Sequence, residues 1–483
     1  MRERIRRLES VSRRLEPDAV ARARAREAVL AYSEDFLDRI GQLKAYEIRK
    51  EAAGDLRAHP PSGEPMRIEA LLDLLGRCVD TPGLNPASGG HMAYIPGGGI
   101  YFSALGDYLA DVTNRYAGIR FASPGAVEME NLLLDWMAAL VGYPEAAAGN
   151  LTSGGSLANL IAVVTAREAR GLAAREFERC VVYSTNQVHH CLDKALRVAG
   201  MGECVRHVVP VDARYRMEPT GLREAVADDR AAGRIPWLVV ASAGTTDVGA
   251  IDPLEEIGRI AREEGLWYHI DAAYGGFFAL VEECRPRLAG MALSDSMVLD
   301  PHKGLFLPYG SGAVLVRDRR ALYRAHRYHA AYMQDTVEEE SLAADSPADL
   351  SPELTKHFRG LRMWFPLMLH GTEPFRACLE EKLLLTRYFH REIGRMGFEV
   401  GPDPELSVST YRWVPRVGDA NAFNRALIRE IHRDGRVFVS STTLDGKFVL
   451  RLAVLAFRTH LDQIDSTLKI LAQKVRGLEE EAP

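Results

Sequence analysis

The middle of the chain alternates between short apolar runs and helix-like segments. Residues 180–184, 237–242 and 266–270 have the composition of buried β-strands, and an amphipathic helix with acids at its start and a basic end begins at Asp252. Strands that alternate with helices in this way form βαβ units, in which the strands lie parallel. The pattern therefore predicts an α/β fold with a mostly parallel sheet.

Three polar side chains stand where predicted strands end. Thr246 follows the run 237–242, Asp271 ends the run 266–270, and Lys303 comes shortly after a fourth apolar run at 296–299. Open α/β sheets bind ligands at the carboxyl ends of their strands, so these side chains are expected to share a site. An amine placed directly after a buried strand can be desolvated and held as a nucleophile, which makes Lys303 the first catalytic candidate.

A second signal lies at residues 152–156, where Thr-Ser-Gly-Gly-Ser opens a helix. Free backbone N–H groups and hydroxyls at a helix N-terminus favour an anion, so this segment is a candidate phosphate cradle around Gly155 and Ser156. It is not a Walker loop, because no Gly-Lys-Ser/Thr follows. An ordinary capped helix explains the segment equally well when it is taken alone.

Pyridoxal 5′-phosphate would use all of these groups. Its aldehyde needs a lysine to form a Schiff base, and Lys303 is the candidate. Its ring nitrogen needs a carboxylate that keeps it protonated, such as Asp271. The small residue Ala273 would let the flat ring lie near the backbone, and His189 could stack on the other face. These residues are therefore candidates for a pyridoxal-phosphate site.

Several of these segments together resemble a known family, the group II pyridoxal-phosphate-dependent amino-acid decarboxylases, and most closely its aromatic-L-amino-acid decarboxylase type. The resemblance runs in order from about residue 85 to 460, and it rests on residues 152–159, 187–189, 244–246, 269–275, 295–296, 301–303 and 359–365. It implies a fold-type-I enzyme with a seven-stranded sheet. It also implies a homodimer with the active site at the subunit interface.

The resemblance further implies three parts of the chain: a helical N-terminal arm (1–85), a large cofactor-binding α/β domain (86–370) and a small C-terminal α+β domain (371–483). The pattern of residues agrees with this division. Apolar residues recur at spacings of three and four between 25 and 40, as in an amphipathic helix. After residue 365, helix-like segments and strand-like segments replace the βαβ pattern.

Carried over by position, the family's residue roles give a specific site. Lys303 forms a Schiff base with the cofactor, Asp271 pairs with the ring nitrogen, His189 stacks on the ring and Thr246 contacts the ring substituents. The phosphate is bound by Gly155, Ser156 and Ser296, with help from Asp300 or His302. Tyr332, on a loop, returns a proton to the substrate carbon, and the substrate pocket contains Tyr94, Ile95 and Pro96.

The implied activity is decarboxylation of an L-amino acid, aromatic or bulky, to its amine. Two alternatives stay open: an aldehyde-forming or retro-aldol reaction on the same scaffold, and a catalytically inactive cofactor-binding regulator. The chain departs from relatives that act on aromatic amino acids at Asp300, where they often have Asn, and at Gly304, where they often have Trp. Decarboxylation is therefore better supported than aromatic specificity.

Composition narrows the class of protein. A formal net charge of −6 and a pI near 6.2 argue against a general nucleic-acid binder. The six cysteines are scattered, without the spacing of a zinc site, as expected for reduced thiols in a cytoplasmic protein. No apolar run approaches the roughly 20 residues of a membrane span, so no membrane partner is expected.

Overall fold

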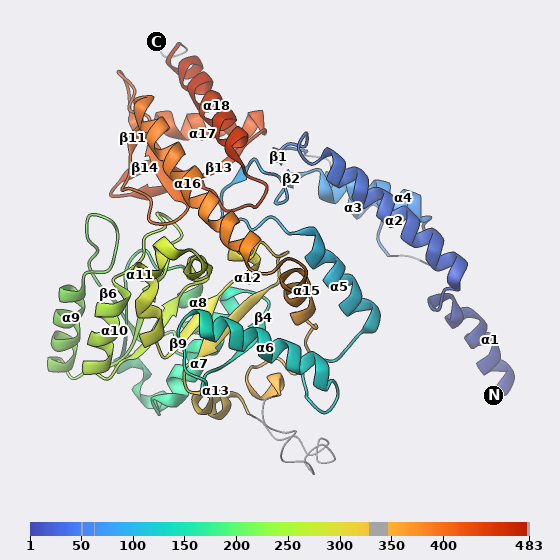
Figure 1. Cartoon of the computed structure of the whole chain (residues 1–483), viewed down its shortest axis with the longest axis horizontal. Helices are drawn as coiled ribbons and strands as arrows, with labels where there is room; N and C mark the ends of the chain where they lie inside the picture. Colours follow the sequence, from blue (N-terminus) through green and yellow to red (C-terminus); the bar gives the residue numbers. More distant parts are fainter. Residues whose placement is uncertain (50–51, 62, 328–345, 481–483) are drawn as a thin grey trace.

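The computed structural model describes residues 1–49, 52–61, 63–327 and 346–480 (Figure 1). In this part of the chain a seven-stranded sheet forms the centre, with the order β4-β10-β9-β8-β7-β5-β6. Only β10 runs antiparallel to its neighbours, so the predicted α/β fold with a mostly parallel sheet is confirmed. The strands are β4 (Ala148–Thr152), β5 (Cys180–Ser184), β6 (Val205–Val208), β7 (Ile235–Ser242), β8 (Trp267–Asp271), β9 (Ser296–Leu299) and β10 (Gly312–Val316).

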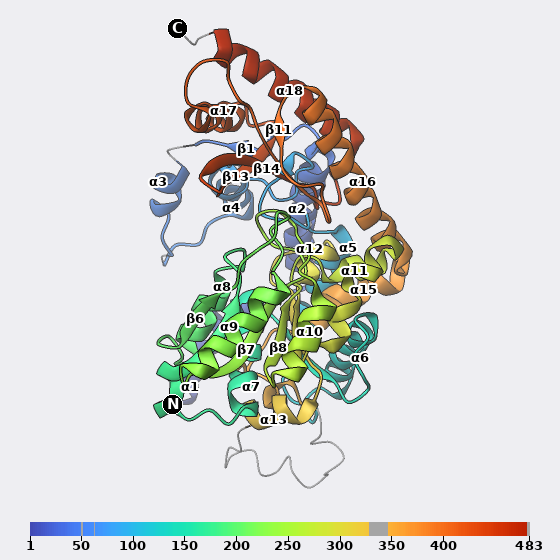
Figure 2. The ribbon, with the colours of Figure 1, turned by 90° about the vertical axis from the view of Figure 1, so that its left-hand side faces the viewer.

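Helices cover both faces of this sheet because its strands are apolar on both sides. Within β5, Val181 and Tyr183 belong to one hydrophobic cluster, whereas Val182 belongs to the other. Figure 2 shows α9 and α10 side by side on one face. The helices of this region are α5 (Tyr101–Thr113), α6 (Pro124–Leu140), α7 (Gly155–Ala169), α8 (Cys191–Val198), α9 (Pro219–Ala231), α10 (Leu254–Glu263), α11 (Arg285–Leu288), α12 (Pro301–Gly304), α13 (Arg319–His326) and α15 (Gly360–His370).

A second sheet of five strands lies in the C-terminal part, with the order β11-β12-β14-β13-β3 among the described residues. Its strands are β11 (Glu399–Val400), β12 (Val408–Arg412), β13 (Phe438–Leu444), β14 (Lys447–Ala453) and the distant β3 (His91–Met92), and α16 (Glu373–Arg395), α17 (Ala420–Asp434) and α18 (Leu461–Glu480) pack with them. β3 pairs in parallel with β13, so a segment before the large sheet completes the small one.

The N-terminal helices extend away from the body as an arm (Figure 1). They are α1 (Arg2–Ser12), α2 (Ala19–Arg39), α3 (Ala52–Arg57) and α4 (Ile68–Leu75). Two short strands of this N-terminal part, β1 (Tyr46–Glu47) and β2 (Gly83–Leu84), pair with each other. Within the described arm, α1 and α2 contain no buried residue. The helical character of the arm agrees with the sequence pattern, while the domain limits at 85 and 370 stay predictions. Across the described ranges, no helix combines the length and apolarity that crossing a membrane requires.

Candidate active site

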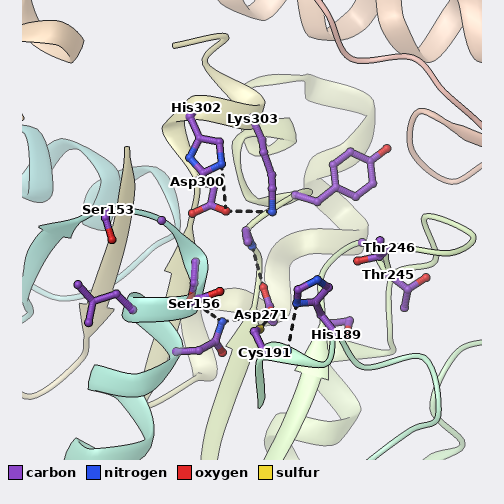
Figure 3. Close-up of a pocket in the computed structure, with 18 of the residues that line it drawn as sticks. Ser153, Ser156, His189, Cys191, Thr245, Thr246, Asp271, Asp300, His302 and Lys303 are labelled. Atoms are coloured by element: carbon purple, nitrogen blue, oxygen red, sulfur yellow. Dashed lines mark hydrogen bonds and ion pairs between the residues drawn. The ribbon is translucent and has the colours of Figure 1, made fainter. Parts of the chain in front are cut away.

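A cavity of about 320 Å³ opens at the carboxyl ends of β5, β7, β8 and β9, beside the N-terminus of α7 (Figure 3). This is the edge of the sheet at which the sequence placed a ligand site. The predicted residues that line the cavity are Gly155, Ser156, His189, Thr246, Asp271, Ala273, His302 and Lys303. Tyr332 lies outside the described residues.

Lys303 reaches the cavity from the short helix α12, which turns the chain directly after β9. Pro301 stands in the first turn of α12, and the Lys303 N–H donates to the carbonyl of Asp300. The Lys303 Nζ lies 2.9 Å from Oδ2 of Asp300. Burial lowers the pKa of Lys303, but the carboxylates of Asp300 and Asp271 outweigh it, so the pKa lies above the ordinary lysine value. The amine of the free enzyme is therefore a paired ammonium.

Asp300 is a buried carboxylate at the edge of the anion cradle. Its side chain is 2% exposed, and its Oδ1 has no hydrogen-bond partner among the described residues. A Cβ placed on Gly155 would lie 3.0 Å from Oδ2 of Asp300, so the carboxylate packs directly against the start of α7. His302 stands on its other side, with Nε2 3.8 Å from the same Oδ2.

The start of α7 forms the cradle itself. Gly154 precedes the helix with φ +151°, a conformation that L side chains rarely adopt, and Gly155 begins it. The first N–H groups of an α-helix have no acceptor within the helix, and here they face the cavity together with Ser153 and Ser156. Donors and helix dipole both favour an anion at this point.

Asp271 ends β8 on the floor of the cavity. Its Oδ1 accepts the N–H of Ala273 at 3.1 Å, and its Oδ2 faces the amide of Asn159 at 3.4 Å and the thiol of Cys191 at 3.8 Å. Sequence reasoning gave Asn159 and Cys191 no role. Asn159 was within reach of that reasoning, because it stands four residues after Gly155 and so lies on the same face of α7.

His189 enters the cavity from the loop after β5. Its Nδ1 accepts the N–H of Cys191 at 3.3 Å, which leaves the proton of the neutral ring on Nε2. Burial lowers the pKa of His189, and the opposing effect of Asp271 does not reverse this. The ring is therefore neutral at pH 7.

Ser296 does not line the cavity, contrary to the role in phosphate binding that the resemblance implied. It lies in β9 and is fully buried. Its Oγ accepts the indole N–H of Trp267 at 2.8 Å and makes a second hydrogen bond to Nδ1 of His269 at 2.8 Å. The hydroxyl is thus committed inside the sheet layer, where a cofactor phosphate does not reach it.

The predicted substrate-pocket residues also lie outside the cavity lining. Tyr94 is 58% exposed and packs near Phe438, while Ile95 is part of the core and Pro96 is buried. The segment nevertheless passes close to α12, because a Cβ on Gly97 would lie 2.1 Å from the carbonyl oxygen of His302. A substrate-binding role for this segment stays a prediction.

An arginine from the small sheet holds the loop that carries Thr246. Arg451 in β14 is buried and donates to the carbonyl of Thr246, to that of Asp247 at 2.8 Å and to Oγ of Ser440 at 2.7 Å. Thr246 and Asp247 are about 200 residues away from Arg451 in sequence, so no local pattern predicts these contacts. The small sheet is therefore joined to the Thr246 loop of the large sheet, beside the cavity, by a guanidinium group whose three nitrogens each donate a hydrogen bond.

These groups fit pyridoxal 5′-phosphate. The anion cradle of α7 suits the phosphate, Asp271 suits the protonated ring nitrogen, and Lys303 suits the aldehyde. Gly154 and Gly155 leave the space that a Cβ would take from the phosphate or from Asp300. Fold and site together define the class of fold-type-I pyridoxal-phosphate enzymes.

Comparisons with known proteins identify the family. The model of the pyridoxal-dependent decarboxylase conserved domain matches residues 65–412. Aromatic-L-amino-acid decarboxylase of Bacillus atrophaeus is 32% identical over 80% of this chain and 81% of its own length, and phenylacetaldehyde synthase of Arabidopsis thaliana is 30% identical over 86% and 87%. Oryza sativa TDC, solved with PLP and tryptamine, superimposes with a TM-score of 0.90 at 25% identity, covering 96% of this chain and 99% of that one.

The chain therefore belongs to the pyridoxal-dependent decarboxylase family. Its cofactor is pyridoxal 5′-phosphate, and its class is that of the carboxy-lyases.

Proposed function

We propose that this protein decarboxylates an L-amino acid with an aromatic or bulky side chain and releases the amine and carbon dioxide. The observation that carries the proposal is the meeting of Lys303, Asp271 and the start of α7 around one cavity. The substrate class is supported by the relatives, one of which is an aromatic-L-amino-acid decarboxylase and another a phenylacetaldehyde synthase.

When bound, pyridoxal phosphate supplies an aldehyde that captures amines and a ring that accepts the electrons of the bond being broken. The residues of this protein would hold the cofactor in place. Gly155 and Ser156 would hold the phosphate, Lys303 would bind the aldehyde group, and Asp271 would keep a proton on the ring nitrogen, since all four residues line the cavity. A carboxylate at that nitrogen stabilises negative charge that develops in the ring, and this is an electrostatic contribution to catalysis.

The neutral ring of His189 and the loop around Thr246 would border the cofactor on its other sides. Arg451 holds this loop from the small sheet, so the cofactor ring would be placed by both sheets together. Return of a proton to the substrate carbon is assigned to Tyr332 as part of the proposal.

The N-terminal arm has exposed apolar side chains. They are Ile5, Leu8 and Val11 of α1 and Val29 of α2, all exposed in the single chain.

We infer that a second copy of the chain covers these apolar side chains, which gives a homodimer. Sedimentation of the purified protein tests this directly, with a dimer as the expected species and a monomer at micromolar concentration as the contrary result. A cytoplasmic location remains a prediction from the scattered cysteines.

A second candidate function has a specific observation behind it: the 30% identity to phenylacetaldehyde synthase, whose name describes an aldehyde product. A retro-aldol lyase would use the same cradle and the same lysine. A catalytically inactive regulator is disfavoured by the complete set of Lys303, Asp271 and His189.

Product analysis separates these functions. Purified protein with added pyridoxal phosphate is incubated with a panel of L-amino acids, and carbon dioxide, amine, aldehyde, ammonia and peroxide are measured. The proposal expects equal amounts of carbon dioxide and amine from at least one aromatic or bulky amino acid, and none with Lys303→Ala. Aldehyde with ammonia and peroxide would establish the second candidate, and the lack of any product from the whole panel would refute both.

A further inference from the structure

A chain of hydrogen bonds runs beneath the cavity from Ser296 to Asp271. The Oγ of Ser296 lies 2.8 Å from Nδ1 of His269, Nε2 of His269 lies 3.0 Å from Oδ1 of Asn159, and Nδ2 of Asn159 lies 3.4 Å from Oδ2 of Asp271. The side chains of Ser296, His269 and Asn159 belong to residues no more than 1% exposed. This chain of hydrogen bonds is therefore shielded from solvent as far as the carboxylate of Asp271, which lines the cavity.

The partners of Asn159 determine which way its amide faces. The amide nitrogen donates to the carbonyl of Gly155 at 2.9 Å and points to Oδ2 of Asp271, and both partners are acceptors only. Its oxygen therefore faces Nε2 of His269, and that nitrogen must carry a proton in order to donate.

The state of His269 follows from the same reasoning. Burial lowers its pKa to about 4, so the ring is neutral at pH 7 and holds a single proton, the one on Nε2. Nδ1 then accepts the hydroxyl proton of Ser296, whose Oγ in turn accepts the indole N–H of Trp267. Every donor in the chain has one acceptor, and no other assignment leaves all of these buried groups satisfied.

We propose that His269 is a positioning residue for the cofactor, which acts through Asn159 on both Asp271 and the phosphate cradle. Its Nε2 proton fixes the amide of Asn159, and the amide nitrogen then holds Asp271 Oδ2 and the Gly155 carbonyl at the start of α7. The ring-nitrogen partner and the cradle are thus set relative to each other by one side chain. This inference rests on the cofactor placement given under the proposed function.

The thiol of Cys191 does not replace this device. Its Sγ lies 3.8 Å from the same Oδ2 of Asp271, and a thiol is a weak donor. If the Nε2 proton of His269 is lost, the amide oxygen of Asn159 has no donor, and the amide is held only through its nitrogen. The long contact of 3.4 Å to Asp271 is then less firmly directed.

Two variants at the same position test the proposal through cofactor binding. In His269→Gln the side-chain amide keeps an N–H donor near the place of Nε2, whereas His269→Leu has a similar volume and no donor. The measurement is the dissociation constant for pyridoxal phosphate, with the melting temperature of the cofactor-free protein measured alongside. His269→Leu is expected to bind the cofactor about tenfold more weakly, the effect of one lost directed hydrogen bond, and His269→Gln within about threefold of the wild type.

Equal cofactor affinity in the wild type and His269→Leu would overturn the proposal. So would an equal loss in both variants that follows their melting temperatures, because this is the result of a merely structural role. If the wild type itself binds no cofactor, the proposed function fails instead, and the two failures are distinguishable.

A second measurement does not depend on His269→Leu. Nitrogen-15 spectra of histidine-labelled protein, with the His269 signals identified by their loss in His269→Gln, report which ring nitrogen carries the proton. The proposal expects a neutral Nε2–H ring that does not titrate between about pH 5.5 and 8. A proton on Nδ1, or titration near the ordinary histidine pKa, would overturn it even if the Leu variant fails to fold.

Discussion

The Nζ of Lys303 and the Oδ2 of Asp300 lie 2.9 Å apart at the edge of the phosphate cradle. The carboxylate that balances the free amine also borders the start of α7 at Gly155, where we place the cofactor phosphate. We expect Lys303 to give up this ammonium pairing when it binds the cofactor. Asp300 should therefore favour the cofactor-free enzyme, whereas an Asn at this position would not.

Asp300→Asn is expected to tighten the binding of pyridoxal phosphate by on the order of tenfold, because it removes one negative charge beside the start of α7, where we place the phosphate. Titration of cofactor fluorescence at pH 7.5 measures this. The matched control is Asp403→Asn, which makes the same charge change at a side chain that is 89% exposed and outside the cavity lining. Unchanged or weaker binding in Asp300→Asn would contradict the opposing role of this carboxylate.

Gly304 is expected to tolerate no side chain. A Cβ there would lie 2.7 Å from Cβ of Phe277, which is fully buried and cannot move aside without disturbing the core. Gly304→Ala should lower the free energy of unfolding by about 1–3 kcal/mol, as overpacking does. Urea unfolding checks this against Gly125→Ala, where the added Cβ meets nothing within 4 Å. Equal stability of the two variants would show that the turn at Gly304 relaxes freely.

The pair formed by Lys356 and Glu130 is expected to stabilise the start of α15. Both side chains are 0% exposed, and Nζ lies 2.8 Å from Oε2. The other carboxylate oxygen of Glu130 accepts the N–H groups of Arg359 and Gly360, both at 3.0 Å. Lys356→Met should cost about 3–5 kcal/mol of unfolding free energy, since it leaves a buried carboxylate without its cation.

The double variant Lys356→Met with Glu130→Gln supplies the control for that pair. It removes both charges and keeps an acceptor for the two N–H groups, so it should recover much of the loss. If the single variant is as stable as the wild type, the buried pair contributes nothing to stability.

The free energy of unfolding is expected to fall in acid because His326 is buried in its neutral form. Burial lowers its pKa to about 4, and its Nε2 lies 3.2 Å from Oγ1 of Thr165, which already donates to the carbonyl of Ile161. The unfolded chain binds a proton near pH 6.5 and the folded one does not, so this contribution is complete above about pH 6.5 and is lost as the pH falls toward 4.

The size of that contribution is at most about 3 kcal/mol, from a pKa difference of roughly 2.5. His326→Gln keeps a donor for Thr165 and cannot titrate. Its unfolding free energy should therefore fall less steeply between about pH 6.5 and 4 than that of the wild type. Parallel curves for the two proteins would contradict a neutral buried His326.

Local sequence patterns were enough for the residues at strand ends. Asp271 and Lys303 follow apolar runs, and parallel strands bring their carboxyl ends to one edge, so the fold class and the centre of the site could be predicted together. The cradle at Gly155 followed from the glycines that open a helix. These features depend on residues close in sequence and on a simple rule of topology.

Residues placed by distant contacts could not be predicted in this way. Arg451 reaches Thr246 from another sheet. The two-residue strand β3 pairs with β13, which is distant from it in sequence. Ser296 shows the converse case. The family resemblance implied phosphate binding by this residue, whereas strand alternation turns its hydroxyl toward Trp267 and His269.

The central claim is that Lys303 is the residue that holds pyridoxal phosphate. The most direct measurement is borohydride treatment of the protein loaded with cofactor, followed by proteolysis and mass spectrometry of the lysine-containing peptides. We expect the reduced cofactor to be attached to Lys303, and we expect no attached cofactor in Lys303→Ala. A cofactor label on another lysine, such as Lys356 or Lys382, or no label on the loaded wild type, would contradict it.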